Sequence, residues 1–516
     1  MVMIQREDEK MKKRDIQEYI RKLEEMNIVT KKVDCSNILD KTVAYMSYNS
    51  QDIRQDTLFV CKGASFKEEY LAEAIDKGVI FYVSEKQYAV DIPGIIVSDI
   101  HIALSELAAM YFGYPGEKLD VIGITGTKGK STTAYYMKYI LEEQAHKVGK
   151  KAPAVISSID TYDGVQNFES HITTPESFDL QQHFRNAVDS EITELVMEVS
   201  SQALKYNRVH NAHFHYGVFL NVSEDHISPI EHPDFEDYFK SKLKIFAKTD
   251  VAIVNLDMDV KDMVLDVAKR DSKKIITFSK QNQSADVYAY AIQKEGLHTK
   301  FRVRTPVLDE EFILTMPGLF NIENALAAIA ISCEMGMEYP VIYEGLKKAK
   351  SSGRMEVYAS KDEKIMAIVD YAHNKLSFEK LFESTKEEYP DRKITIVFGC
   401  PGKKALLRRR DLGLIAGQNA DYIYLTAEDP GEEPVEKISK DIAQYVALHT
   451  TNYELIEDRG EAIHEAVQRA EREAGKTVIL ITGKGNETRQ KIGKEYIPCQ
   501  TDVEYVTAYL TEYDEK

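Results

Sequence analysis

The chain has 516 residues, a formal net charge of −18, and a composition that is 43% hydrophobic and 29% charged. This length is too great for one ordinary core and predicts about three domains. The negative charge argues against a nucleic-acid partner, whose phosphates would be repelled over most of the surface. No apolar run approaches the ~18 residues needed to cross a membrane, so we expect no membrane partner.

The first twenty residues are charged, which argues against a secretory signal. The five cysteines are scattered along the chain without C-x-x-C spacing, at Cys35, Cys61, Cys333, Cys400 and Cys499. This spacing fits a reducing cytoplasm better than a disulfide framework or a zinc site. We therefore expect a soluble cytoplasmic protein.

Residues 1–118 are predicted to form a small N-terminal α/β domain, of which residues 1–41 are a charged leader with a helical start. Short β-rich runs such as 57–61 and 94–97 alternate with helical runs such as 70–76. The pattern ends at a Tyr-Pro-Gly turn, residues 114–116, where a domain boundary is expected.

A glycine-rich stretch, Gly123-Ile-Thr-Gly-Thr-Lys-Gly-Lys-Ser131, follows an apolar strand-like run and opens a helix-like run at 132–141. This context predicts a phosphate-binding loop, because glycines let backbone N–H groups close on phosphate oxygens at a helix N-terminus. Lys130 would reach the outer phosphates, and Ser131 can hold Mg²⁺. ATP is therefore the predicted ligand, bound by Thr125, Gly126, Thr127, Lys128, Gly129, Lys130, Ser131 and Thr132.

Residues 119–350 are predicted to form a central P-loop ATPase-like domain. Strands such as 194–198 and 250–255 alternate with helical segments, which indicates a mainly parallel sheet with the loop at its carboxyl edge. The same alternation returns in residues 351–516, with strands at 365–370 and 477–482. That segment is expected to be a C-terminal doubly wound, Rossmann-like α/β domain.

Two residues that follow central strands are candidate magnesium ligands. Glu198 ends an apolar strand, and a carboxylate opposite a phosphate loop is where a magnesium ion bridging ATP and protein needs an oxygen. His226 follows the next strand and could supply a second ligand, although a lone histidine there is more often a hydrogen-bonded structural residue.

The order Thr-Gly-Thr-x-Gly-Lys-Ser resembles the ATP loop of Mur ligases and folylpolyglutamate synthetases, which join a carboxylate to an amine with hydrolysis of ATP. Four further motifs resemble Mur ligases of the UDP-N-acetylmuramoyl-tripeptide synthetase type. They stand in family order at 173–176 (T-T-P-E), 197–203 (M-E-V-S-S-Q-A), 220–226 (L-N-x-x-x-D-H) and 238–242 (Y-x-x-x-K).

The resemblance implies that Lys242 reacts with CO₂ to become a carbamate, an anionic oxygen ligand for magnesium. Lys240 and Lys244 are close by, but only Lys242 keeps the family's Tyr-to-Lys spacing. The implied catalytic residues are then Lys130, Glu198, His226 and carbamylated Lys242, and the implied metal ligands are Ser131, Glu198, His226 and Lys242.

The same resemblance assigns residues to a UDP-muramoyl-dipeptide substrate: Ser50, Thr173, Thr174, Ser200 and Arg208. Asn49 and Gln51 replace the acid and arginine that flank the family's serine. The resemblance also assigns Asn321, Arg354, Asp370 and His373 to ATP, which implies that the third domain closes over a nucleotide held by the central one.

The amino-acid recognition loops depart from the family pattern. Family members that add meso-diaminopimelate carry D-N-P-R, whose arginine can pair with the extra carboxylate, and here the aligned residues are Glu428, Asp429, Pro430 and Gly431. The remaining residues that the resemblance assigns to the amino acid are Arg409, Gly483 and Glu487. The missing arginine at 431 and Gln202 favour L-lysine, with meso-diaminopimelate and ornithine left open.

The resemblance implies an ATP- and Mg²⁺-dependent ligase, a monomer, that adds a diamino acid to the D-glutamyl carboxylate of UDP-MurNAc-L-Ala-D-Glu through an acyl phosphate in peptidoglycan biosynthesis. A folylpolyglutamate synthetase shares the loop and the chemistry but gives no reason for the first domain. An inactive ligand-binding paralogue would explain the altered recognition residues, but not the intact Lys130, Glu198, His226 and Lys242.

Overall fold

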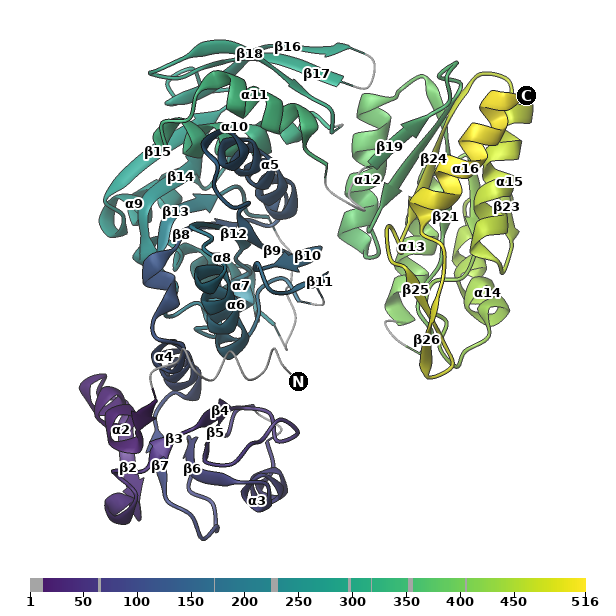
Figure 1. Cartoon of the computed structure of the whole chain (residues 1–516). Helices are drawn as coiled ribbons and strands as arrows, with labels where there is room; N and C mark the ends of the chain where they lie inside the picture. The colour runs from purple at the N-terminus through teal and green to yellow at the C-terminus, as the bar shows by residue number, and fades with distance from the viewer. Residues whose placement is uncertain are drawn as a thin grey trace. The chain divides into compact units, whose positions relative to one another are not determined.

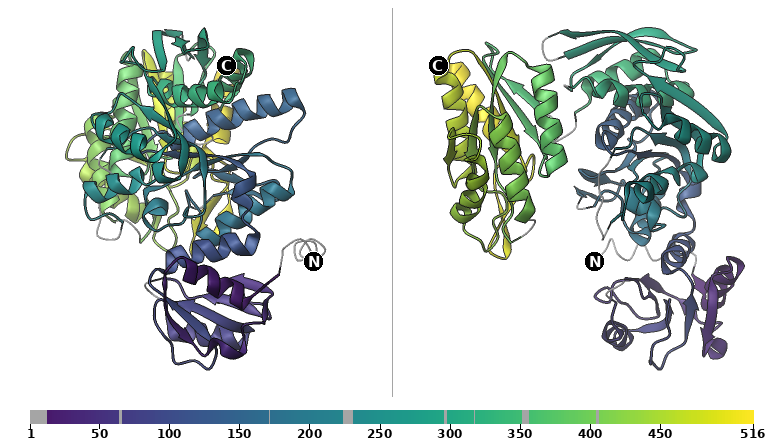
Figure 2. Two further views of the ribbon diagram at one scale, coloured as in Figure 1. Left: turned by 90° about the vertical axis from the view of Figure 1, so that its left-hand side faces the viewer. Right: turned by 180° about the vertical axis from the view of Figure 1, so that it is seen from behind.

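We analysed a computed structural model of the chain, which describes residues 13–63, 66–170, 172–223, 231–295, 298–316, 318–350, 356–403 and 406–516. Within these ranges the chain forms sheets in which parallel strand pairs dominate, covered by helices (Figures 1 and 2). The predicted α/β class is therefore confirmed.

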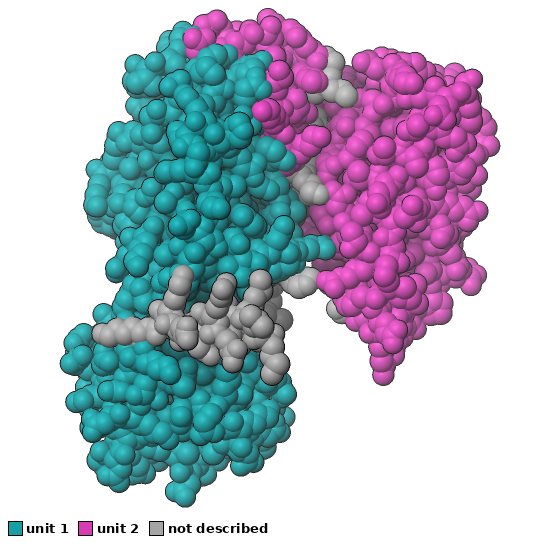
Figure 3. Space-filling model, viewed as in Figure 1, with its two compact units in different colours: residues 1–289, 303–309, 323–345 teal, residues 290–302, 310–322, 346–516 magenta. Residues whose placement is uncertain are grey.

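The chain divides into two compact units, which Figure 3 distinguishes by colour. The first comprises Met1–Ala289, Val303–Asp309 and Glu323–Gly345, and the second comprises Tyr290–Arg302, Glu310–Ile322 and Leu346–Lys516. The first unit contains all of the N-terminal sheet and the strands around the glycine-rich loop. The three-domain division at 118 and 350 stays a prediction.

The N-terminal sheet has five strands in the described residues. In sheet order they are β2 (Val29–Val33), β7 (Gly94–Val97), β6 (Val79–Ser84), β5 (Thr57–Val60) and β4 (Tyr45–Ser47), with only β2 antiparallel to its neighbour. The helices are α2 (Ile16–Glu25), α3 (Glu68–Asp76) and α4 (Ile100–Phe112), and a short ladder joins β1 (Arg14–Asp15) to β3 (Thr42–Val43). Leu58 and Val60 pack with α2 and α4, whereas Phe59 packs with α3, as the twofold alternation of a strand requires.

The largest sheet has eleven strands within the described ranges. In sheet order they are β11 (Asn167–Glu169), β10 (Asp160–Tyr162), β9 (Ala154–Ile156), β12 (Glu194–Glu198), β8 (Asp120–Thr125), β13 (Phe214–Phe219), β14 (Thr249–Asn255), β15 (Lys274–Ser279), β16 (Val287–Glu295), β17 (His298–Arg304) and β18 (Asp309–Leu314). The pairs from β9 through β16 are parallel.

Seven helices belong to this sheet region in the described residues: α5 (Lys130–Val148), α6 (Ser177–Asp189), α7 (Ser201–Lys205), α8 (Phe235–Leu243), α9 (Lys261–Asp271), α10 (Asn321–Glu334) and α11 (Tyr339–Lys348). Short 3₁₀ turns lie at Cys35–Asn37, Pro115–Lys118 and Phe246–Lys248. One core joins Val121 and Met197 of the sheet to Leu180 and Phe184 of α6. Burial of each such side chain stabilises the folded state by roughly 1.5–3 kcal/mol.

The C-terminal sheet has six strands in the part that is described. In sheet order they are β19 (Glu356–Ala359), β20 (Ile365–Asp370), β24 (Lys476–Thr482), β21 (Arg392–Phe398), β22 (Tyr422–Leu425) and β23 (Tyr453–Leu455), with only β19 antiparallel. Its helices are α12 (Lys375–Glu388), α13 (Leu406–Asn419), α14 (Val435–Val446), α15 (Arg459–Arg472) and α16 (Asp502–Glu515), and β25 (Arg489–Ile492) pairs with β26 (Glu495–Pro498).

The two faces of this sheet are covered by different helices. Ile368 and Leu480 face a core shared with α12, α13 and α14, whereas Val369 and Ile481 face a core shared with α15 and α16. Adjacent residues of one strand therefore enter opposite cores, which is the doubly wound arrangement predicted for this segment. None of the helices in the described residues combines the length and the apolar character needed to cross a membrane.

Candidate active site

The glycine-rich loop connects β8 to α5 at the carboxyl edge of the parallel sheet. Helix α5 begins at Lys130, and its N-cap is Gly129, with φ of +84°. A Cβ at Gly129 would lie 2.2 Å from Asn324 Oδ1, so both the backbone conformation and the space require glycine. The loop thus brings backbone N–H groups to the positive end of a 19-residue helix.

Gly123, the first glycine of the motif, is not part of the loop. It lies within β8, between the parallel neighbours β12 and β13. A Cβ there would lie 2.5 Å from the ring of Phe214. This glycine allows close packing inside the sheet, and the loop itself spans residues 126–129.

Asn221, which follows β13, braces the loop. Its Oδ1 accepts hydrogen bonds from the N–H groups of Thr127 and Lys128 at 3.0 and 2.9 Å, and its Nδ2 donates to the Lys128 carbonyl at 3.1 Å. Thr125 Oγ1 donates to the Val199 carbonyl at 2.8 Å. Asn221 was not predicted as a site residue, although it stands inside the L-N-x-x-x-D-H motif.

Two lysines donate to the carbonyl of the same loop residue, Gly126. Lys130 Nζ lies 3.0 Å from this oxygen, and Lys242 Nζ lies 2.9 Å from it and 4.6 Å from the ring centre of Tyr238. The Lys242 residue is only 1% exposed, whereas the Lys240 side chain is 68% exposed and pairs with Glu236. Burial therefore distinguishes Lys242 from Lys240 on the same helix.

Glu198, at the end of β12, lies among other oxygen atoms. Its Oε1 accepts from the N–H and the hydroxyl of Ser158 at 2.9 and 3.1 Å, and Ser158 Oγ lies 3.1 Å from Ser131 Oγ. Carboxylate and hydroxyl oxygens are the donors that Mg²⁺ prefers, so this set fits the predicted ion. Ser158 was missed by sequence reasoning, because nothing marks a serine 40 residues before its partner.

No group of three or more His, Cys, Asp or Glu side chains that could hold a metal occurs among the described residues. His226, which was predicted to be a metal ligand together with Glu198, lies outside the described residues. Its prediction therefore stays a prediction.

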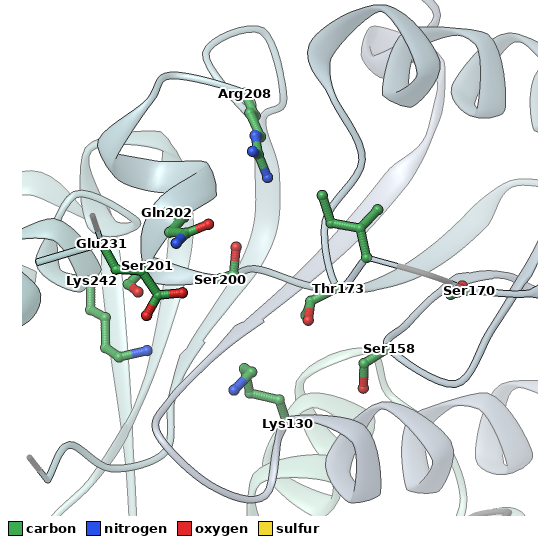
Figure 4. A pocket seen from close by; sticks show the side chains of 11 residues that line it. Lys130, Ser158, Ser170, Thr173, Ser200, Ser201, Gln202, Arg208, Glu231 and Lys242 are labelled. Atoms are coloured by element: carbon green, nitrogen blue, oxygen red, sulfur yellow. The ribbon is translucent and has the colours of Figure 1, made fainter. Parts of the chain in front are cut away.

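A cavity of about 330 Å³ opens beside the loop (Figure 4). It is lined by residues that are mostly polar or charged: Lys130, Ser158, Ser170, Ile172, Thr173, Ser200, Ser201, Gln202, Arg208, Glu231 and Lys242. Side chains from α5, the segment after β12 and α8 thus meet at one place. Three of them are cationic, which suits an anionic ligand.

Of the residues predicted to bind the UDP-linked substrate, Thr173, Ser200 and Arg208 line this cavity, and Thr174 is hydrogen-bonded to the latter two. Thr174 Oγ1 donates to the Glu198 carbonyl at 2.9 Å and accepts from the Ser200 N–H at 3.0 Å. Ser200 caps α7 by accepting from the Ala203 N–H. Arg208 donates to the Thr174 carbonyl at 3.4 Å, and Thr173 lines the cavity directly.

Glu176 joins two cations beside this cavity. Its carboxylate lies 2.9 Å from Arg208 and also pairs with Lys62, which follows β5 of the N-terminal sheet. All three side chains are less than one-fifth exposed. The pairing of Lys62 with Glu176 was not predicted, because the two residues are 114 positions apart.

Ser50 lies in a turn after β4 and is not among the residues that line the cavity. Hydrogen bonds from Asn49 N–H to Ser47 Oγ and from Gln51 N–H to Asn49 Oδ1 shape this turn. The Ser50 carbonyl accepts from Lys77 at 2.9 Å. The residues at 49 and 51 that differ from the family thus lie in an ordered turn.

Four residues from segments after the glycine-rich loop were also predicted to bind ATP. Asp370 ends β20, where its Oδ1 accepts from the Ala372 N–H at 2.7 Å, and His373 Nδ1 lies 2.7 Å from the Tyr371 carbonyl. Asn321 begins α10 and is buried. Arg354 lies outside the described residues.

The residues predicted to bind the amino-acid substrate lie at the carboxyl edge of the C-terminal sheet. Glu428 is 8% exposed, and burial raises its pKa to about 7. Gly483 has φ of +102°, and a Cβ there would lie 2.5 Å from Glu428 Oε2. Gly431 pairs with the β25 segment, because its N–H donates to the Lys491 carbonyl at 3.0 Å. The carbonyl of the preceding residue, Pro430, accepts from the Glu433 N–H.

Lys484 is a buried cation that sequence reasoning did not single out. Its Nζ donates to Asp429 Oδ1 at 2.9 Å and to the Arg489 carbonyl at 2.7 Å, and it also pairs with Glu487. The predicted residues Asp429 and Glu487 thus share one lysine. The position of the lysine between two loops fixes both carboxylates.

Arg409 is held by acids of its own unit. Its guanidinium contacts both carboxylate oxygens of Glu433, at 3.1 and 2.6 Å, and Asp441 at 2.7 Å. The Arg409 side chain is 3% exposed. A role in amino-acid binding stays a prediction.

The chain matches known proteins over most of its length. Two family models match the chain, the Mur ligase middle domain over residues 124–332 and the Mur ligase, glutamate ligase domain over residues 353–485. The chain is 36% identical over 478 residues to the UDP-N-acetylmuramoyl-L-alanyl-D-glutamate--L-lysine ligase of Enterococcus faecalis, covering 92% of each chain. It is 39% identical over 462 residues to the enzyme of that name from Streptococcus pneumoniae serotype 4, covering 89% of this chain and 91% of the relative.

A solved UDP-N-acetylmuramoyl-L-alanyl-D-glutamate--2,6-diaminopimelate ligase has a similar fold, with a TM-score of 0.67 and 22% identity over 97% of this chain and 99% of that chain. The phosphate-binding loop and the cation-lined cavity beside it define a nucleotide-dependent α/β enzyme. The chain belongs to the Mur ligase family, whose members are ATP-dependent ligases. The family resemblance inferred from the sequence is thereby confirmed.

Proposed function

We propose that this enzyme adds L-lysine to the D-glutamyl carboxylate of UDP-MurNAc-L-Ala-D-Glu, at the expense of ATP, in peptidoglycan synthesis. The observation that carries the proposal is the cavity beside the glycine loop, where Lys130, Lys242 and Arg208 meet in a chain 36% identical to an L-lysine ligase over 92% of its length. ATP's γ-phosphate would pass to the substrate carboxylate, and the amine of the amino acid would attack the resulting acyl phosphate.

The loop residues 125–132 are the proposed site for the ATP phosphates. Lys130 already bends back over the loop to the carbonyls of Gly126 and Thr127, so its ammonium lies where the outer phosphates would come. Asn321, Arg354, Asp370 and His373 are proposed to complete the nucleotide site. These residues would assemble by closure of the C-terminal segment over the nucleotide.

Magnesium is proposed to be held by Ser131, Glu198, His226 and carbamylated Lys242. When bound, it would neutralise the negative charge that develops on the transferring phosphoryl group. A carbamate on Lys242 is supported by its position: Lys242 lines the cavity, and Lys130 donates to the same Gly126 carbonyl, so two like charges lie close together there. Carbamylation would replace this cation with an anionic oxygen ligand.

The UDP-linked substrate is proposed to contact Ser50, Thr173, Thr174, Ser200 and Arg208. The hydrogen bonds among Thr174, Ser200 and the Glu198 carbonyl fix the first two residues relative to the proposed metal site. Arg208 would offer its guanidinium to an anionic group of the substrate, a pairing that is stronger than a neutral hydrogen bond.

L-lysine is proposed as the amino acid, because the recognition loops present carboxylates and lack the arginine that a second carboxylate would need. Glu428, Asp429 and Glu487 lie near one another through Lys484, and position 431 is glycine. Arg409, Pro430, Gly431 and Gly483 are proposed to shape the same site. L-ornithine carries the same charges on a shorter side chain and is the second candidate.

The test is ADP release from ATP and Mg²⁺ with UDP-MurNAc-L-Ala-D-Glu, in parallel with L-lysine, meso-diaminopimelate, L-ornithine and no amino acid. We expect release with L-lysine. Release with meso-diaminopimelate alone would refute the proposed specificity. No release with any of them would favour the inactive paralogue, and release only with a folate and glutamate would favour a folylpolyglutamate synthetase. The monomeric state and cytoplasmic location are proposed with this function.

A further inference from the structure

A serine, a histidine and an aspartate form a buried chain of hydrogen bonds that ends at the cavity wall. Ser201, the first residue of α7, lines the cavity, and its Oγ lies 3.0 Å from His232 Nε2. His232 Nδ1 lies 2.6 Å from Asp237 Oδ2. The His232 residue is 0% exposed, and these two contacts engage both of its ring nitrogens.

The charges around His232 fix the direction of each hydrogen bond. A hydrogen bond from Lys205 Nζ, at 2.7 Å, and the contact with His232 lower the pKa of Asp237, so this side chain is a carboxylate that can only accept. His232 Nδ1 must therefore donate to it. In the neutral imidazole, Nε2 is then the acceptor and receives the hydroxyl proton of Ser201.

The other neighbours of the imidazole among the described residues do not change this assignment. The ring of Tyr238 lies 5.2 Å from it, edge to face, and Lys205 Nζ also donates to the carbonyl of Glu231 at 3.0 Å. Ser201 thus directs its proton inward and keeps lone pairs for the cavity. A hydroxyl in this state accepts hydrogen bonds from an amine.

We propose that Ser201, hydrogen-bonded to His232 and through it to Asp237, takes a proton from the ammonium group of the incoming amino acid. The resulting amine then attacks the acyl phosphate. This inference rests on the proposed ligase function. One proton of the ammonium passes to Ser201 Oγ as the Ser201 proton passes to His232 Nε2, which leaves a neutral amine, and Asp237 stabilises the imidazolium. The amine nitrogen then bonds to the acyl carbon, the carbon–oxygen bond to phosphate breaks, a second proton leaves the nitrogen with inorganic phosphate, and the amide keeps the third.

The composition of the cavity wall favours this serine over its neighbours. Lys130 and Arg208 are cations that would repel an ammonium, and Ser158 Oγ is engaged with Glu198. Figure 4 shows Ser201 on the same side of the cavity as Gln202 and Glu231, across from Thr173 and Ser158. Of the lining hydroxyl groups, Ser201 is the one for which the described residues show an imidazole partner, the side chain whose ordinary pKa best suits a general base.

The test compares two nucleophiles in the Ser201→Ala and Asp237→Asn variants. L-lysine needs a base to lose its proton, whereas hydroxylamine is largely unprotonated at neutral pH and traps the acyl phosphate without one. We expect both variants to lose about a hundredfold in kcat with L-lysine and less than about twofold in hydroxamate formation. Their rate with L-lysine should also rise about tenfold per pH unit, as the free amine becomes more abundant.

The matched control is Asp250→Asn, which removes the carboxylate from another His–Asp pair, with His213 at 2.9 Å, away from the cavity. Asp237→Asn keeps the N-cap bond of α8, because that bond uses the Asp237 N–H. Ser201→Ala leaves the His232–Asp237 pair in place, so it remains informative if Asp237→Asn fails to fold.

Equal losses with both nucleophiles, or no loss with L-lysine, would overturn the inference. Wild-type enzyme that forms neither amide nor hydroxamate would instead contradict the proposed ligase function. The two failures are therefore distinguishable in one set of measurements.

Discussion

Charged side chains that are wholly or partly buried occur in both units of the enzyme, but their positions differ. Beside the glycine loop, Lys130 and Lys242 donate to the backbone carbonyl of Gly126. In the C-terminal sheet region, Arg409 is paired with Glu433 and Asp441, and Arg459 with Asp502. Lys130 and Lys242 line the cavity, where a ligand can reach them, whereas Arg409 and Arg459 do not line it and are fixed by carboxylates of the C-terminal sheet region. We therefore expect the first group to control turnover and the second to control stability.

The largest expected effect is on turnover, from Lys242→Met. Removing the residue proposed to carry the carbamate should lower kcat about a thousandfold while the melting temperature changes little. Steady-state ADP release and thermal unfolding measure the two quantities. Lys240→Met, on the exposed face of the same helix, is the control and should retain wild-type turnover. A large loss of stability in Lys242→Met would break the comparison.

The next effect is on stability, from Arg409→Met. This change leaves the buried Glu433 carboxylate without its main partner, and we expect the free energy of unfolding to fall by about 3 kcal/mol. Urea unfolding measures it. Lys403→Met, which removes an exposed pair with Glu432, should cost less than about 1 kcal/mol. Unchanged stability with a raised KM for L-lysine would show that Arg409 binds substrate.

Glu428→Gln should change how stability depends on pH. The unfolded chain ionises this residue near its ordinary pKa of 4.5, whereas burial raises the folded-state pKa to about 7. The folded protein therefore binds more protons in this interval, and this contribution to stability is lost as the pH rises from about 5 to 8. Relative to wild type, the variant should gain on the order of 2 to 3 kcal/mol over that range. Parallel urea curves at pH 5 and pH 8 would contradict the raised pKa.

The smallest expected effect comes from Glu176→Gln. The neutral amide would loosen both Lys62 and Arg208, and we expect the KM for the UDP-linked substrate to rise about fivefold, with kcat nearly constant. Initial rates at varied substrate concentration test this. Glu236→Gln, which breaks the exposed pair with Lys240, should leave KM unchanged.

The parts of the fold that were predictable from the sequence are the buried parallel strands. Strands at 94–97, 194–198 and 365–370 were predicted with the bounds that the structure shows, because strands buried on both faces are continuous apolar runs. Strands β11 and β17 were missed. The residues of β11 are exposed and those of β17 alternate with charged ones, so neither stands out as an apolar run.

The candidate site was predictable where its residues are adjacent in sequence. The loop at 126–131 was predictable from the spacing of its glycine, lysine and serine residues and from the helical pattern that follows them. The brace from Asn221, the link from Ser158 to Glu198 and the chain from Ser201 to His232 join residues 31 to 94 positions apart. Such contacts are decided by the order of strands in the sheet, which residue spacing does not encode.

The measurement that tests the central claim most directly is the mass of the product formed from UDP-MurNAc-L-Ala-D-Glu, ATP and Mg²⁺ in an equimolar mixture of L-lysine, meso-diaminopimelate and L-ornithine. The account predicts one main product, whose mass exceeds that of the substrate by one lysine residue. A product carrying diaminopimelate, or recovery of the unchanged substrate, would contradict it.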